Sequence, residues 1–303
     1  MTQQSASSSA LMSLGPVPRR LAIFLAWVLA TCLLFYRPIA AFISYSLSND
    51  NASHLVLIPV ISAWIIFLER QRIFKSIGSD LGRSTFFLAT GILLGVWAVM
   101  AGSHWSSLNQ LSLFILALIM FWLAGFAFVF GPHALRSAQF PLAFLILTIP
   151  IPDFLLEKLI YLLQRGSAEI AAVLFDWSGV PVLRDGFVFH FAHVSIEVAR
   201  ECSGIRSSLA LLILAILVAH FYLDRFWKQV VLVLVGLFVM ILKNGVRIVT
   251  LTLLASYVDP GFLYGRLHHE GGVVFFLLGL VLMLPVLWLL QRGERKSSLT
   301  AAG

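Results

Sequence analysis

The sequence predicts an all-α polytopic membrane protein, with about eight transmembrane helices and a small extracytoplasmic cap made of an amphipathic helix and a short β-hairpin. Two observations lead to this fold class. Of the 303 residues, 60% are hydrophobic and 12% are charged, and the mean hydropathy is +0.95, whereas a soluble domain is about half apolar and about a quarter charged. The apolar residues also gather in runs close to the ~20 residues that a helix needs to cross a bilayer.

We expect three parts along the chain: a disordered N-terminal tail at 1–18, a transmembrane domain at 19–292 and a cytoplasmic C-terminal tail at 293–303. The N-terminal tail is rich in serine and contains two prolines, a composition that favours disorder. The apolar run after it has no small-residue cleavage site, so we interpret it as a first span rather than a secretory signal. Eight spans are predicted, at 21–36 (with a possible extension), 54–68, 84–102, 107–130, 138–151, 204–222, 229–257 and 271–290. The fifth is short, and Pro141 interrupts it.

The positions of lysine and arginine predict the orientation of these spans. With the N-terminus inside, the inner connections carry basic residues, whereas the outer connection at 103–106 carries none. The long outer stretch at 153–201 has four basic residues against seven acidic ones. Because lysine and arginine concentrate in cytoplasmic loops, we expect both termini in the cytoplasm. The net charge of +7 is spread over short clusters rather than one patch, which argues against nucleic-acid binding.

The long outer stretch is expected to form the cap. Residues 154–175 alternate apolar blocks with charged and amide side chains, a pattern typical of an amphipathic helix lying in the membrane interface. Residues 180–189 place Asp185-Gly186 between β-prone residues, which predicts a β-hairpin. The cap therefore leads directly into Cys202.

Cys202 is a candidate nucleophile. It lies just before a predicted helix start, where Ser203 can cap the helix and a positive helix end lowers the pKa of a thiol. Arg206 follows four residues later and can face the same side. The alternative is a packed, unreactive cysteine, which is the more frequent case for an isolated cysteine and the interpretation we adopt for Cys32 within the first span.

Arg247 strengthens the case for a functional site. It lies inside an apolar run of about 29 residues, where an arginine costs about 3 kcal/mol or more unless it faces protein or a water-filled cavity. Asn244 is three residues earlier and shares a helix face with it. Lys243 is a further candidate for the same polar site. The alternative is a structural hydrogen-bonding group between helices.

His268 and His269 lie at the outer end of the last predicted span, beside Glu270. An imidazole is the usual group that takes a proton from a thiol near neutral pH, although an isolated histidine here is more often simply solvated. In the predicted topology, both histidines, Cys202 and Arg247 reach the same outer face. That coincidence favours catalysis by a thiol nucleophile, a histidine acid or base, and an arginine that stabilises the thiolate or a tetrahedral oxyanion.

No metal or cofactor is expected. His190 and His193 are three residues apart in the cap, but no further ligand cluster accompanies them. The sequence has no glycine-rich phosphate loop, no Gly-x-Ser-x-Gly and no His-Glu-x-x-His.

At these motifs the chain resembles the exosortase/archaeosortase family of polytopic membrane cysteine enzymes, from about residue 20 to 290. The resemblance rests on Cys202-Ser203-Gly204-Ile205-Arg206, on Asn244-x-x-Arg247-Ile248, on a late histidine before glycine and Phe275-Phe276, on Val180-Pro181-Val182 with Arg184-x-Gly186, and on Ser53-His54 with Pro59. Leu55 stands where the family has glycine after the early histidine. The family spaces its late histidine four residues before a glycine, which selects His268, but His269 stays open.

The resemblance implies a cysteine peptidase or transpeptidase acting through a thioester, with Cys202, Arg247 and His268 (or His269) as catalytic residues. The supporting residues it implies are Asn244, Arg206, Ser203 and His54. The implied substrate is an exported protein with a C-terminal signal, made of a short motif such as Pro-Glu-Pro, a transmembrane helix and a basic tail. The implied location is the bacterial inner membrane, with an extracytoplasmic active site and membrane lipid around the helices.

Two other functions are compatible with the same residues. A transporter or channel could bind an anion at Arg247 and Lys243, and it would tolerate the loss of Cys202 but not of Arg247. A polysaccharide-export or assembly factor with a structural polar core would tolerate both changes without altering the processing of any exported protein.

Overall fold

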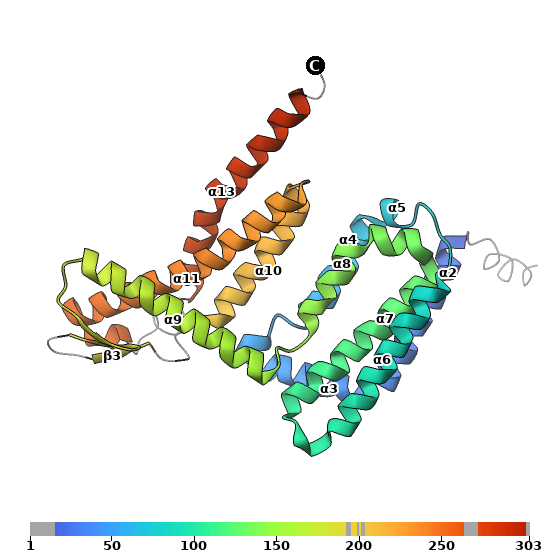
Figure 1. Cartoon of the computed structure of the whole chain (residues 1–303), viewed down its shortest axis with the longest axis horizontal. Helices are drawn as coiled ribbons and strands as arrows, with labels where there is room; N and C mark the ends of the chain where they lie inside the picture. Colours follow the sequence, from blue (N-terminus) through green and yellow to red (C-terminus); the bar gives the residue numbers. More distant parts are fainter. Residues whose placement is uncertain (1–15, 192–194, 199, 201–203, 264–271, 301–303) are drawn as a thin grey trace, which may run out of the picture. The chain divides into compact units, whose positions relative to one another are not determined.

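The structure, a computed structural model of the whole chain, describes residues 16–191, 195–198, 200, 204–263 and 272–300. Helices make up most of it (Figure 1). The chain divides into two compact units, Met1–Asp153 and Phe154–Gly303.

The regular elements of the first unit are all helices in its described part. Its elements are α2 (Pro16–Leu34), α3 (Tyr36–Ser48), η1 (Asp50–Ala52), α4 (Leu57–Leu68), α5 (Arg70–Ile73), α6 (Leu81–Ala101), η2 (Gly102–His104), α7 (Ser107–Ser137), α8 (Gln139–Phe144) and η3 (Leu145–Thr148). The long helix α7 packs against α2, α3 and α6. Its rings of Phe126 and Phe130 lie 5.7 and 5.5 Å from the ring of Phe24 on α2, so an aromatic core holds these helices together.

Side-chain oxygens cap the N-termini of two long helices in the first unit. A carboxylate oxygen of Asp80 accepts a hydrogen bond from the backbone N–H of Arg83 at 3.0 Å, at the start of α6. The hydroxyl of Ser106 accepts one from the backbone N–H of Asn109 at 3.1 Å, at the start of α7. Both caps satisfy N–H groups that a helix leaves without a partner at its first turn.

Two of the predicted spans end at sharp bends, of 81° and 92°. The run predicted at 21–36 ends at a bend of 81° around Phe35, after which the chain continues as α3. The run predicted at 138–151 is α8 followed by the 3-10 helix η3, which ends at Thr148. Pro150 and Pro152 follow, and because proline lacks a backbone N–H and clashes with the preceding turn, it disfavours continuation of the helix.

A kink in α7 explains why the fourth span was predicted to end at Phe130. The next residue, Gly131, has a φ of 81°, and Pro132 follows it. A Cβ at Gly131 would lie 2.8 Å from the backbone carbon of Gly78. Only glycine permits both this backbone conformation and this close approach, so the apolar pattern stops where the helix changes direction.

By length and composition, six helices in the described part of the chain can cross a membrane, or up to eight if each of two bent helix pairs forms one span. This confirms the predicted all-α polytopic membrane fold.

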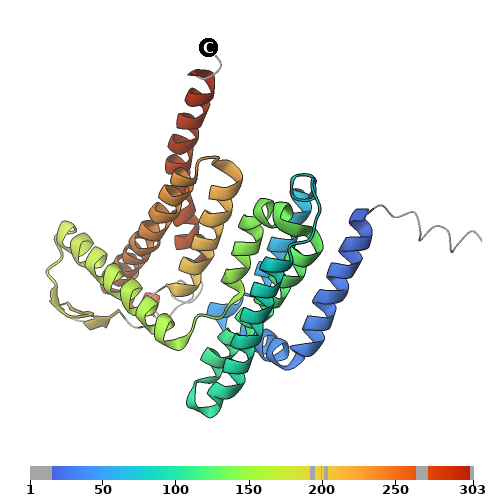
Figure 2. The same ribbon diagram turned by 45° about the vertical axis from the view of Figure 1, so that its right-hand side comes forward.

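The second unit combines helices with a small sheet. Its elements are α9 (Asp153–Trp177), β1 (Leu183–Asp185), β2 (Val188–His190), β3 (Ser195–Glu197), α10 (Ile205–Tyr222), α11 (Phe226–Tyr257), η5 (Pro260–Leu263) and α13 (Gly272–Thr300). Helices α10, α11 and α13 pack against one another, as Figure 2 shows. The apolar core between them includes Leu211, Leu232, Val239 and Met283.

The predicted hairpin is present, and a third strand extends it. Strand β1 pairs with β2 antiparallel, with Asp185 opposite Val188, and Gly186 in the turn has a φ of 57°. Strand β3 pairs with the other edge of β2, with Phe189 opposite Ile196. The sequence analysis missed β3 because three residues are too few to show an alternating pattern.

The sheet packs on the predicted amphipathic helix, which is α9. The ring of Phe189 on β2 lies 5.3 Å from that of Phe175 on α9, and both are buried. Ile248 and Val249 of α11 belong to the same apolar cluster. The cap therefore rests on α9 and on the part of α11 that carries the predicted arginine motif.

Candidate functional site

The described part of the candidate site is built around Gly204, the residue that precedes α10. Its φ of 67° and ψ of 21° are left-handed, a conformation that glycine adopts without steric cost. It is buried, and a Cβ added there would lie 2.6 Å from Oδ1 of Asn244 on α11. Glycine therefore lets the start of α10 approach α11 closely, which brings two of the sequence-predicted motifs together.

Asn244 links this point to α9. It is 1% exposed, and its Nδ2 donates a hydrogen bond to Oγ of Ser167 at 2.9 Å. The adjacent Gly245 allows the same close packing, because a Cβ there would lie 2.5 Å from the side chain of Ile170 on α9. The predicted supporting residue Asn244 thus lies where α9, α10 and α11 meet.

Lys243 supports the first turn of α10 from the other side. It is 1% exposed, and its Nζ donates a hydrogen bond to Oγ of Ser207 at 2.6 Å. The hydroxyl of Ser207 in turn donates to the carbonyl oxygen of Gly204 at 3.1 Å. A buried ammonium is costly unless it is hydrogen-bonded, so this chain of contacts accounts for the lysine and ties it to the turn.

Arg247 lies one turn along α11 and is half-buried. It is four residues from Lys243 and three from Asn244, spacings that place all three on one stripe of the helix. Two cations and an amide on one stripe form a positive environment suited to an anionic group. The sequence predicted that Arg247 and Asn244 share a helix face, and both lie in the helix α11.

The other predicted residues are distributed as follows. Cys202, Ser203, His268 and His269 lie outside the described residues. Arg206 is exposed on the first turn of α10. His54 is half-buried in the turn before α4, in the first unit.

The sequence analysis missed two serines of this site, Ser167 and Ser207. For Ser167, the amphipathic pattern of α9 contained a signal. Gln164 and Ser167 are three residues apart on α9, and both are buried, whereas Glu169 is exposed. The amide of Gln164 donates to the carbonyl oxygen of Val198 at 2.5 Å. The polar residues of the amphipathic pattern therefore lie on two faces, one toward water and one toward α11 and the cap.

Ser207 was missed because serine inside a helix is common and its partner, Lys243, is distant in the sequence.

No group of three or more histidine, cysteine, aspartate or glutamate side chains suited to a metal ion occurs among the residues that the structure describes. The donors around Gly204 are an ammonium, an amide and hydroxyls. Such groups can donate hydrogen bonds to an acyl oxygen or an anion.

A family model described as transmembrane exosortase matches residues 44–285. The match covers about four fifths of the chain and includes all of the residues around Gly204 described above. The chain belongs to the transmembrane exosortase family. Searches of curated proteins and of solved structures give no match. Membership confirms the resemblance found in the sequence and establishes a multi-pass membrane protein with an exosortase-type function.

The exosortase match runs across both units, from α3 to α13. Helix α2 and the C-terminal part of α13 lie outside it. All of the sequence-predicted site residues of this exosortase, from His54 to His269, lie within the matched range.

Proposed function

We propose that the protein is a membrane cysteine peptidase or transpeptidase. It cleaves the C-terminal sorting signal of exported proteins at the outer face of the bacterial inner membrane, with both termini in the cytoplasm. The observation that carries this proposal is the close approach of Gly204 to Asn244. Cys202 is two residues before Gly204, so chain geometry keeps their Cα atoms within about 7.6 Å. A thiol and the positive stripe of α11 are therefore held in one neighbourhood.

The proposed reaction begins when the Cys202 thiolate attacks the carbonyl carbon of the scissile peptide bond. The C–N bond breaks, and His268 or His269, having taken the thiol proton, gives it to the leaving amine. A thioester remains. An acceptor amine or water then attacks it and releases the thiol. Arg247 supplies positive charge for the tetrahedral oxyanion that forms in each half of the reaction.

The residues around Gly204 position this chemistry. Lys243 and Ser207 hold the carbonyl of Gly204 and so fix the first turn of α10. Asn244, anchored by Ser167, fixes the other side. Arg206, Ser203 and His54 are supporting residues in the proposal, and no metal or cofactor takes part.

The proposed substrate carries a transmembrane helix, which is compatible with an enzyme built of membrane-spanning helices. Its signal combines a short motif of the Pro-Glu-Pro type, a transmembrane helix and a basic tail. The helix can pack beside the enzyme's own spans in the membrane, and the basic tail stays on the cytoplasmic side. This arrangement places the short motif at the outer face, where the thiol is proposed to act.

The proposal is tested with a tagged substrate candidate and an immunoblot of whole cells. Cys202→Ala and Arg247→Ala should each accumulate the full-length substrate at unchanged enzyme level, while the control Cys32→Ala should process normally. If Cys202→Ala processes normally and Arg247→Ala does not, a transport function fits better. If neither change alters processing, the peptidase proposal is wrong.

A further inference from the structure

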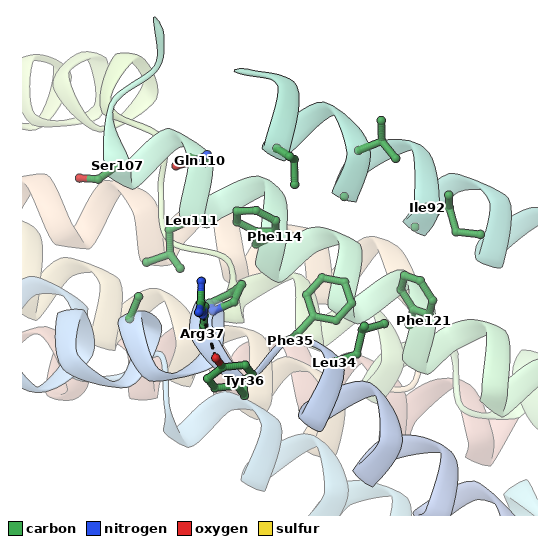
Figure 3. A pocket seen from close by; sticks show the side chains of 16 residues that line it. Leu34, Phe35, Tyr36, Arg37, Ile92, Ser107, Gln110, Leu111, Phe114 and Phe121 are labelled. Atoms are coloured by element: carbon green, nitrogen blue, oxygen red, sulfur yellow. Dashed lines mark hydrogen bonds between the residues drawn. The ribbon is translucent and has the colours of Figure 1, made fainter. Parts of the chain in front are cut away.

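The first unit contains an elongated apolar cavity of about 730 Å³ between the α2–α3 bend, α6 and α7. Its walls include Phe35 at the bend, Gly91 and Gly95 on α6, and Phe114 and Phe121 on α7. In Figure 3, Ser107, Gln110 and Arg37 lie toward one end, and Phe121 and Ile92 lie toward the other. The cavity therefore has a polar end and an apolar end.

The polar end carries positive charge. Arg37 is exposed, and its Nε donates a hydrogen bond to the hydroxyl of Tyr36 at 2.8 Å. The cavity's lining, all of it among the described residues, contains no aspartate or glutamate. Guanidinium groups bind phosphate oxygens through short, charge-assisted hydrogen bonds. An anionic group of a ligand is therefore favoured at this end.

The length of the apolar part matches one leaflet of a bilayer. Gln110 and Phe121 are eleven residues apart on α7, which is about 16 Å along a helix. The hydrocarbon core of a bilayer is about 30 Å thick, so one leaflet provides about 15 Å. Because α7 is a candidate span, the cavity has the right environment as well as the right length for a lipid chain.

We propose that this cavity binds one anionic glycerophospholipid, with an acyl chain along α7 and the phosphate at Arg37. The occupant is distinguished from bulk lipid by the guanidinium, which selects for headgroup charge, and by the open space beside Gly95, which a chain can fill. A Cβ added at Gly95 meets no atom within 4 Å. The wall is thus open there rather than closed by packing. This site is independent of the proposed peptidase activity.

The test uses the full-length protein in detergent and two lipids with identical acyl chains, anionic phosphatidylglycerol and zwitterionic phosphatidylcholine. Native mass spectrometry measures retained lipid, and thermal unfolding measures stabilisation. We expect the wild type to bind phosphatidylglycerol roughly tenfold more tightly, and Arg37→Gln to remove that preference, because one charge-assisted contact is lost. Arg19→Gln removes an equal charge from an exposed position outside the cavity and should retain the preference.

Filling the cavity provides the second variant. Gly95→Leu should weaken the binding of both lipids, whereas Gly82→Leu, on the same helix and outside the cavity, should not. Gly95→Ala replaces Gly95→Leu if the latter does not fold. Equal retention of the two lipids by the wild type would overturn the proposal, as would Arg37→Gln behaving like Arg19→Gln. Stabilisation by inorganic phosphate alone, equal to that by phosphatidylglycerol, would overturn it in favour of a simple anion site.

Discussion

The two units bury polar side chains in different ways. Among the described residues, the buried polar side chains of the first unit are all serine or threonine, and several donate to backbone carbonyls, as Ser62 does to Pro141 at 2.7 Å. The second unit also buries two lysines, a glutamine and an asparagine. Hydroxyls are easily satisfied by a nearby carbonyl, whereas amides and ammonium groups need dedicated partners. Three of these four groups, Lys243, Asn244 and Gln164, have their partners around the candidate site, whereas Lys228 bonds to Leu290 on α13. The first unit has no comparable group among its described residues.

The largest stability effect should come from the first unit. Phe126 is 1% exposed, and its ring lies 5.0 Å from that of Phe130. Phe126→Ala should lower the free energy of unfolding by about 3 kcal/mol, because it leaves a cavity that the packed helices cannot close. Phe128, on the same helix and 50% exposed, is the control, and Phe128→Ala should cost far less. Thermal unfolding in detergent measures both, and equal losses would show that this aromatic cluster is not the core.

At Gly204 we expect a smaller loss of unfolding free energy than at Phe126, but a large loss of substrate processing. Gly204→Ala combines a left-handed backbone with a Cβ placed 2.6 Å from Oδ1 of Asn244. We expect a loss of about 2 kcal/mol in unfolding free energy and loss of substrate processing. Gly179 has a similar φ of 69°, but no atom lies within 4 Å of an added Cβ.

Gly179→Ala therefore carries the backbone cost alone, about 1 kcal/mol. Subtracting its effect from that of Gly204→Ala isolates the contact with Asn244. A double variant, Gly204→Ala with Asn244→Gly, should recover part of the lost stability. If Gly179→Ala and Gly204→Ala cost the same and both process substrate, the close approach of α10 to α11 is unimportant.

Lys243→Met should change the reactivity of Cys202 while leaving the free energy of unfolding nearly unchanged. Replacing a buried charge by an apolar side chain of similar size is often neutral for folding, so we expect a change in unfolding free energy below about 1 kcal/mol. In a Cys32→Ala background, the maleimide labelling rate of Cys202 at neutral pH should fall roughly tenfold, because a nearby cation that favours the thiolate is removed.

Lys228 is the matched control for that experiment. It lies on the same helix, is 3% exposed, and its Nζ donates to the carbonyl oxygen of Leu290 at 2.6 Å. Lys228→Met should leave the labelling of Cys202 unchanged. A similar slowing in both variants would mean that the lysines act on overall packing rather than on the proposed nucleophile.

The smallest effect is expected at the surface of the cap. Arg184 pairs with Glu169 through two hydrogen bonds of 2.8 and 3.0 Å, but Glu169 is 59% exposed. Arg184→Gln should cost less than about 1 kcal/mol, because solvent screens such pairs. Donating these hydrogen bonds to the Glu169 carboxylate raises the pKa of the Arg184 guanidinium.

A raised pKa in the folded state gives stability that is lost only as the pH rises through that value, which for arginine lies far above neutral pH. The contribution of Arg184 should therefore be constant from about pH 6 to about pH 9. Unfolding curves of wild type and Arg184→Gln across this range measure it. A difference that varies across that range would identify another titrating partner.

The sequence predicted those features that depend on local pattern. Apolar runs located the candidate spans, Asp185-Gly186 located the hairpin, and the spacing of Asn244 and Arg247 placed them on one helix face. The bend at Phe35 lies at the predicted end of the first span, where Arg37 and Pro38 interrupt the apolar run. Its angle was not predictable, because it depends on how α2 and α3 pack against α7.

The contacts of the candidate site were only half predictable for a similar reason. Each motif was visible alone, but the hydrogen bonds of Lys243 to Ser207 and of Asn244 to Ser167 join residues 36 and 77 positions apart. Nothing in the local sequence distinguishes these serines from others inside helices. A hydroxyl's partner is decided by tertiary packing, which single-sequence patterns do not encode.

The short segment at 199–203, which carries the proposed nucleophile, begins and ends beside anchors that trace to one helix. Before it, Val198 accepts a hydrogen bond from Gln164; after it, Gly204 abuts Asn244, which is bonded to Ser167. Gln164 and Ser167 are one turn apart on α9, so the contacts on both sides of this segment lead to the same turn of one helix. The positions of Val198 and Gly204 therefore both depend on contacts with the Gln164–Ser167 turn of α9, Gly204 through Asn244.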